Sequence, residues 1–362
     1  MLGNKKSEAL LANIRNGLPM SQNEKLKLIV SLSIPSILAQ ITTVMMFFID
    51  ASMVGHLGAE ASASIGLVES TTWLMGSVMS AASMGFSVQV SHFIGANDFF
   101  KARQVFRHGL LCGLAFSLII AAIGTSIHSV LPLWLGGGND INHDASQYYL
   151  VFSLTMPFIL LFHLSASMIK CSGNMQLPSL MSVLLCVLDV IFNYLFIYML
   201  HLGVVGAAIG TSMAYISTSL PIAWMATRRN KILALQLDNV PFKWVWDYVT
   251  KAIRISLPMA IQSVLMSGAQ IVSTLIVAPL GNIAIASNSF AITAESLCYM
   301  PGYGIGDAAT TLVGQTYGAG RKDLCKSFAH MTVGLGMLVM AFMGLIMYIF
   351  APEMIGLLSP VE

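Results

Sequence analysis

Charged residues are scarce in this chain of 362 residues: Asp, Glu, Lys and Arg make up only 9% of it, whereas 56% is hydrophobic. A soluble domain carries about 25% charged residues. A mean hydropathy of +0.77 implies more apolar surface than a soluble core can bury, so we expect lipid to be the solvent. The net charge of +2 is too small to indicate a nucleic-acid partner.

Several motifs that would mark other functions are missing. The five cysteines contain no CxxC pair, the spacing typical of metal and redox sites. There is no GxxxxGK[ST], so ATP is not expected to drive this chain directly. No Ser/His/Asp or metal-ligand cluster indicates an enzyme, and no long strand-like alternation indicates a barrel. We therefore expect a protein that is not an enzyme and has no resident metal or cofactor.

Long apolar runs are present instead, and they predict an all-α polytopic membrane protein. A span needs roughly 20 apolar residues. Clusters of Gly and Asn separate the runs, as turns require. The nine predicted spans are 28–54, 62–93, 106–132, 147–169, 178–200, 203–227, 252–277, 284–316 and 327–351.

The first and last parts of the chain repeat one another. A single ungapped shift pairs Pro35 with Pro258 and Gly95 with Gly318, among many other matches. Six predicted spans separate the starts of the two copies, so both enter the membrane from the same side. This favours two parallel-repeat helical lobes, an arrangement that occurs in secondary transporters.

The repeat divides the chain into four predicted parts. They are a cytoplasmic N-terminal segment (1–27), a six-helix lobe (28–228), a cytoplasmic linker (229–250) and an incomplete second lobe of three helices (251–362). All 18 basic residues fall on one side of this arrangement, which by the positive-inside rule places the N-terminus in the cytoplasm. The second copy lacks counterparts of three helices, so we expect a fragment or a truncated product.

The repeated units carry recognisable sequence elements. The first span contains Leu32-Ser33-Ile34-Pro35 and later Phe48-Ile49-Asp50-Ala51-Ser52-Met53-Val54-Gly55. The fifth ends in Asp189-Val190-Ile191-Phe192-Asn193, and the eighth continues into Val313-Gly314-Gln315-Thr316-Tyr317-Gly318-Ala319-Gly320. In this order they resemble the multidrug and toxic compound extrusion (MATE) family from about residue 17 onward. The resemblance implies twelve helices in two lobes, a V-shaped cleft, and drug export coupled to inward H⁺ or Na⁺.

Acidic residues inside the spans are the candidate functional residues, because a carboxylate in hydrocarbon is costly. Asp50 has no basic residue on its side to neutralise it, and its counterpart in the second copy is Ser273. Asp189 lies one helical turn from Asn193 on the same face. The resemblance implies that Asp50 couples cations and that Thr211 lies near this site. The family more often has the amide before the acid, so this chain departs from its pattern.

Three further acids lie in predicted spans. Glu69 and Glu295 are candidates to line a cleft and attract cationic substrates, with a water-facing position as the alternative. Asp307 lies nearer the cytoplasm, where the head groups of Lys or Arg can reach it, so we expect a structural role.

Together these features predict a cation-coupled antiporter that exports small organic compounds across the inner membrane, with cationic compounds as one option. We expect a monomer embedded in the bilayer. One alternative is a lipid-linked oligosaccharide flippase of the same superfamily, which would favour a more cationic cavity. The other is a non-transporting, truncated membrane protein.

Overall fold

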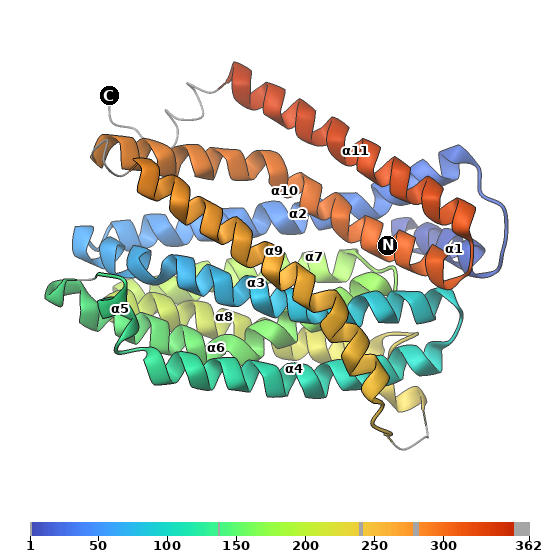
Figure 1. The fold of residues 1–362 in the computed structure, drawn as a ribbon, viewed down its shortest axis with the longest axis horizontal. Helices are drawn as coiled ribbons and strands as arrows, with labels where there is room; N and C mark the ends of the chain where they lie inside the picture. The colour runs from blue at the N-terminus through green and yellow to red at the C-terminus, as the bar shows by residue number, and fades with distance from the viewer. Residues whose placement is uncertain (1, 137, 239–241, 278–281, 351–362) are drawn as a thin grey trace.

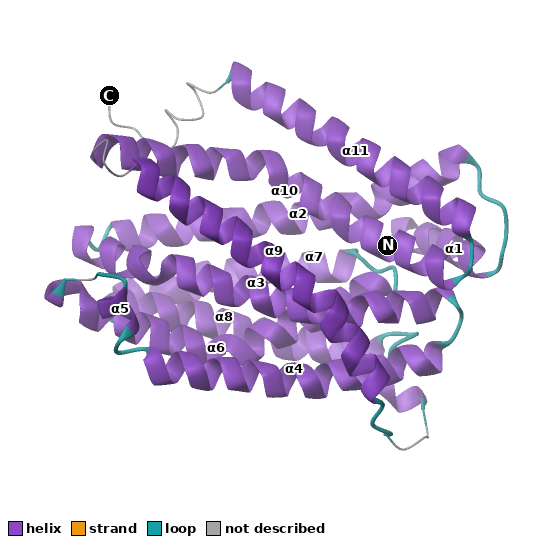
Figure 2. Ribbon diagram, in the orientation of Figure 1, coloured by secondary structure: helices purple, strands orange, loops and turns teal. Residues whose placement is uncertain are grey.

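The computed structural model describes residues 2–136, 138–238, 242–277 and 282–350, and these residues form helices and loops only (Figure 2). Each of the nine predicted spans falls mainly on one helix over its described residues, and residue 351, the end of the ninth span, lies outside them. The first lobe contains α2 (Gln22–Gly55), α3 (Ala59–Gly95), α4 (Phe99–Ile127), the short α5 (Leu131–Trp134), α6 (Asn139–Cys171), α7 (Gln176–Asn193) and α8 (Gly203–Trp224). The second contains α9 (Trp246–Val277), α10 (Asn282–Gly318) and α11 (Lys322–Ile349).

Seven of these helices are long and apolar enough, over their described residues, to cross a membrane: α2, α4, α6, α7, α8, α9 and α11. The other two predicted spans, α3 and α10, are the longest helices, with 37 residues each, but both are rich in Ser and Thr. In α3 the side chains of Ser83, Ser87 and Ser91 are buried, because this helix packs against α4, α6, α9 and α10. A helix surrounded by protein does not need an apolar surface on every side.

The two lobes meet through reciprocal contacts of their equivalent helices. In Figure 1, α9 crosses α3 diagonally and α10 runs along α2, while α11 lies at the outer edge against α10. The repeat makes α2 equivalent to α9 and α3 equivalent to α10. The contact between α2 and α10 is therefore equivalent to the contact between α9 and α3. The helices α3 and α10, which are equivalent to each other, also pack together.

The connections that carry basic residues lie at one end of the bundle, the right-hand end in Figure 1. They include the turns from α3 to α4 and from α10 to α11, and the linker from α8 to α9. We call this end the basic end.

The N-terminal segment forms a helix that the sequence pattern did not predict. The helix α1 (Leu2–Arg15) buries Leu10, Leu11 and Ile14 in a cluster with residues of α2, α10 and α11. Its last turn is fixed by Arg15, whose backbone oxygen accepts a hydrogen bond from the Asn97 side chain at 3.2 Å. Three apolar residues on one face are too few to mark a membrane span, but they suffice to dock an amphipathic helix.

Two predicted boundaries differ from the observed ones. The third predicted span ends at 132, whereas α4 ends at Ile127 and α5 follows with Pro132 in its first turn. Proline cannot donate the hydrogen bond that an unbroken helix would need there. The predicted linker ends at 250, whereas α9 begins at Trp246. The π-helical segments η1 (Tyr194–Met199) and η2 (Met225–Arg229) extend α7 and α8, and η3 (Leu235–Leu237) is a single 3₁₀ turn in the linker.

Candidate cation site

Two carboxylates and an amide meet where α2 packs against α7 in the first lobe. Asp50 lies in the last turns of α2, whereas Asp189 and Asn193 lie one turn apart at the end of α7. The side chains of Asp189 and Asn193 are 0% and 1% exposed, and Asp50 is partly buried. Asp189 and Asn193 therefore lie on one face of α7, as their spacing predicted, and in the folded structure this face points toward Asp50.

A single amide nitrogen bridges the two carboxylates. Asn193 Nδ2 donates to Asp50 Oδ1 at 2.8 Å and to Asp189 Oδ2 at 3.1 Å, which uses both of its hydrogens. The Asp50 and Asp189 carboxyls are also close enough to interact directly, and the Thr211 side chain of α8 interacts with Asp189. The structure thus brings together all four residues predicted for this site.

The remaining oxygens of this group are poorly satisfied. Asp189 Oδ1 and Asn193 Oδ1 are buried and have no hydrogen-bond partner within normal distance. Buried polar atoms are nearly always paired, so an unpaired one requires an explanation. Two orphaned oxygens beside a second carboxylate are a donor set that fits a proton or a hard monovalent cation.

Close packing of α8 against α7 holds Asn193 in place. A Cβ added to Gly210 would overlap Asn193 Oδ1, and one added to Gly206 would lie 2.8 Å from the backbone oxygen of Phe196. The two glycines are four residues apart, so they form a smooth strip on α8. The π-helical segment η1 starts directly after Asn193, and such segments are frequent at functional sites.

The family model described as MatE matches residues 35–195 and 258–362, which is most of the chain. The chain belongs to the MatE family. A probable multidrug resistance protein NorM from Thermotoga maritima is 24% identical over 351 residues, covering 95% of this chain and 75% of that protein. This MatE chain thus spans about three quarters of the length of that relative.

Solved structures show the same fold. A MOP superfamily transporter from Pyrococcus furiosus, whose description reports a binding pocket of reverse polarity and suggests a different function, superimposes with a TM-score of 0.87. It is 24% identical and is matched over 93% of this chain and 75% of its own. An outward-facing multidrug resistance MATE family transporter gives a TM-score of 0.86 at 23% identity, with 92% and 74% covered. The predicted family and the all-α membrane fold are confirmed.

The two predicted substrate-cleft residues of this MatE chain lie on helices of different lobes. Glu69 is exposed on α3, where it interacts with Trp73, and it lies within electrostatic range of Tyr148, as do Asp50 and Asp189. Glu295 is exposed on α10 of the second lobe. Their contribution to substrate binding stays a prediction.

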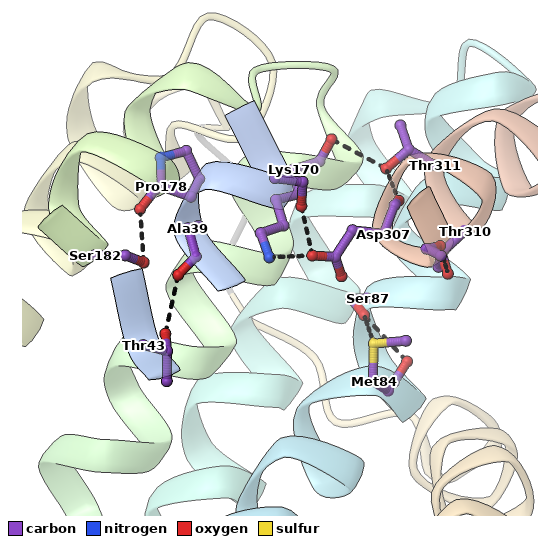
Figure 3. Close-up of polar contacts among 12 residues, drawn as sticks. Ala39, Thr43, Met84, Ser87, Lys170, Pro178, Ser182, Asp307, Thr310 and Thr311 are labelled. Carbon is purple, nitrogen blue, oxygen red and sulfur yellow. Dashed lines mark hydrogen bonds and ion pairs between the residues drawn. The ribbon is translucent and has the colours of Figure 1, made fainter. Parts of the chain in front are cut away.

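Asp307 makes the kind of contact that its position predicted, although its partner could not be named from the sequence. The Lys170 ammonium at the end of α6 lies 2.6 Å from Asp307 Oδ2 (Figure 3). Ser36 of α2 donates to the same oxygen at 2.6 Å. Lys170 directly follows the predicted span 147–169 and is the one Lys or Arg between that span and the next. A single basic residue at this position is the signal that could have drawn attention to it.

Proposed function

We propose that this MatE chain exports small organic compounds, cationic ones among them, in exchange for H⁺ or Na⁺. The site formed by Asp50, Asp189, Asn193 and Thr211 would bind the coupling ion. The observation that carries this proposal is the single Asn193 amide that bridges carboxylates from two different helices. We further propose an inner-membrane location, with the basic end of the bundle in the cytoplasm.

The proposed coupling follows from the cost of two negative charges in a nearly dry site. Without a bound cation, Asp50 and Asp189 repel each other, and one amide only partly offsets this repulsion. A proton or Na⁺ removes one net charge, so α2 and α7 can pack differently in the loaded and empty states. Each charge that enters gains about 2.3 kcal/mol per 100 mV of membrane potential, and each proton gains about 1.4 kcal/mol per pH unit.

The substrate class rests on two kinds of support. The Thermotoga maritima relative is named as a probable multidrug resistance protein. The acidic side chains of Glu69 and Glu295 are suited to organic cations. The flippase alternative requires free positive charge at depth, whereas Lys170 is neutralised by Asp307. A non-transporting role remains the second alternative, and it predicts no flux under any gradient.

The test is the flux of a fluorescent organic cation such as ethidium in vesicles that contain the purified chain. An imposed pH gradient or, separately, an imposed Na⁺ gradient drives the exchange and distinguishes the two ions. We expect Asp50→Asn to insert normally and to reduce gradient-driven flux at least about tenfold, because it removes a charge that the coupling ion must neutralise.

The matched control is Asp144→Asn, which removes an exposed acid near the start of α6 and should leave flux unchanged. Undiminished gradient-driven flux in Asp50→Asn would exclude this coupling site. Absence of flux in the unmodified chain under both gradients would reject the transport function itself.

A further inference from the structure

Three polar residues of α10 contact the end of α6, across the boundary between the two lobes. Asp307 pairs with the Lys170 side chain, and Thr311 Oγ1 donates to the Lys170 backbone oxygen at 3.2 Å (Figure 3). Gln315 Nε2 donates to the Cys171 backbone oxygen at 2.8 Å. The three α10 residues are spaced four apart, so they form one stripe on the helix. We call these five residues the α6–α10 seam.

The seam exists because α6 ends there. The last four carbonyl groups of a helix have no partner within it, and α6 ends at Cys171. The hydroxyl of Thr311 gives the Lys170 oxygen a second donor beside the Gly173 N–H. The amide of Gln315 supplies a donor to the Cys171 oxygen, and both side chains come from the other lobe. Ser36 adds a bond from α2 to Asp307, so α10 is tied to two helices of the first lobe at once.

The ion pair of the seam is a contact that water can replace, whereas Thr311 and Gln315 are 1% and 0% exposed and become hydrated only when the helices part. The Lys170 and Asp307 side chains are 18% and 21% exposed, so this ion pair is only partly buried. Separating the two helices at this point would hydrate carbonyl groups and charges, whereas separating an apolar interface would expose hydrocarbon. Polar contacts of this kind cost little to break when solvent can enter.

Next to the seam, α3 and α10 cross closely at positions where one of the two helices has a glycine. A Cβ on Gly95 would overlap the Gln315 backbone oxygen, and a Cβ on Gly314 would overlap the Ser91 side chain. The two helices therefore touch through the backbone at Gly95 and through the Ser91 side chain at Gly314, and the rings of His92 and Tyr317 also meet across the crossing. Ser91 is 0% exposed as a result.

We propose that the α6–α10 seam is the gate that closes the basic end of the bundle and must open during each transport cycle. The ion pair Lys170–Asp307 is its main bond, and Thr311 and Gln315 fix its register. This proposal rests on the proposed transport function in one respect, which is that the basic end of the bundle opens and closes as the lobes move. It does not depend on the cation site at Asp50 and Asp189.

The experiment uses Ser91→Cys as a reporter in a full-length background whose five native cysteines are replaced by Ala or Ser. A maleimide reacts with this buried thiol only when α3 and α10 part. We expect Asp307→Asn and Lys170→Met each to speed labelling roughly ten- to hundredfold, the range for losing a hydrogen bond to a charged group. The exchange of the two residues, Lys170→Asp with Asp307→Lys, should restore slow labelling.

The matched control is Asp247→Asn, which breaks an ion pair of equal length, 2.6 Å, between two exposed residues of α9. It should leave labelling unchanged. If Asp307→Asn fails to fold, Thr311→Val removes one seam bond without leaving a charge behind and should still speed labelling.

Unchanged labelling in both Thr311→Val and Lys170→Met would overturn the gate. So would fast labelling in the charge-exchanged protein when it melts at the same temperature as its parent. Because labelling is read without a gradient or a substrate, a failed gate and a failed coupling site give different results. Asp50→Asn alone can abolish flux while the gate variants still speed labelling.

Discussion

The Asn193 amide donates hydrogen bonds to the carboxylates of Asp50 and Asp189, and its position depends on a glycine, Gly210. Gly210 of α8 lies directly against the Asn193 side-chain oxygen, and any larger residue would occupy that volume. The two hydrogen bonds of the amide fix the carboxylates relative to each other. At this scale the geometry of the site depends as much on a glycine in α8 as on the acids themselves.

Gly210→Ala should therefore displace Asn193 and disrupt the site. We expect the free energy of unfolding to fall by about 1–3 kcal/mol, the usual cost of overpacking, and gradient-driven flux to fall with it. Thermal unfolding of the purified protein and the vesicle flux assay measure the two effects. Gly66→Ala is the control, because a Cβ there meets open space. Normal flux in Gly210→Ala would show that the position of Asn193 is not critical.

At the scale of elements, the linker from α8 to α9 is attached to α4 by Arg103 and Arg107, whose side chains bond to linker residues, and by the buried His108. His108 is 0% exposed; its Nδ1 bonds to the Gln104 backbone oxygen at 2.7 Å, and its Nε2 accepts from the Val245 N–H at 2.9 Å. A carbonyl oxygen only accepts, so the proton sits on Nδ1 and the ring is neutral. Trp244 and Tyr248 pack around the ring, with centroids 5.1 and 5.4 Å away. The linker is thus packed and hydrogen-bonded against α4.

His108→Phe keeps the ring but removes both hydrogen bonds, which should loosen the linker. The Val245 N–H then lacks its partner, at a cost of about 1–3 kcal/mol. Hydrogen exchange at Val245 and its neighbours should accelerate roughly tenfold or more. The control, His128→Phe, removes only a bond to Thr125 within the last turn of α4. Equal exchange rates in the two variants would mean that His108 does not hold the linker.

At the scale of the whole molecule, the repeat places equivalent glycines on both sides of one crossing. Gly95 of α3 lies against Gln315 of α10, and its equivalent Gly318 of α10 lies against His92 of α3. Each lobe therefore contributes one glycine that allows the backbone of the other lobe's helix to approach closely. The sequence match between the copies is explained here by packing, since only residues without a Cβ allow the two helices to approach so closely.

Gly95→Ala and Gly318→Ala should have the same effect, because they occupy equivalent places in one contact. Either added methyl group would push α3 and α10 apart and speed maleimide labelling of Cys at position 91 several-fold or more. Gly334→Ala on α11 is the control, because a Cβ there meets nothing within 4 Å. Opposite effects of the two variants would contradict the symmetric crossing.

Much of the fold could be predicted from the sequence, because lipid restricts the choices. Backbone groups in hydrocarbon must bond within their own segment, so long apolar runs can only be helices. The spacing of Asp189 and Asn193 placed them on one face, and the cost of a carboxylate in lipid marked Asp50. The amphipathic helix α1 was missed because its apolar face, with Leu10, Leu11 and Ile14, is short.

The sequence by itself determined the long apolar helices, the repeat, the family and the set of candidate acids, since each follows from local pattern or from order along the chain. Only the tertiary structure decided which groups from distant segments meet. It brought Asp50 to Asn193 across 143 residues of chain and Lys170 to Asp307 across 137. The physical reason is that these pairs depend on how helices pack against each other. Glycines such as Gly210 and Gly95 allow close packing, but the helix that each one faces is known only from the folded structure.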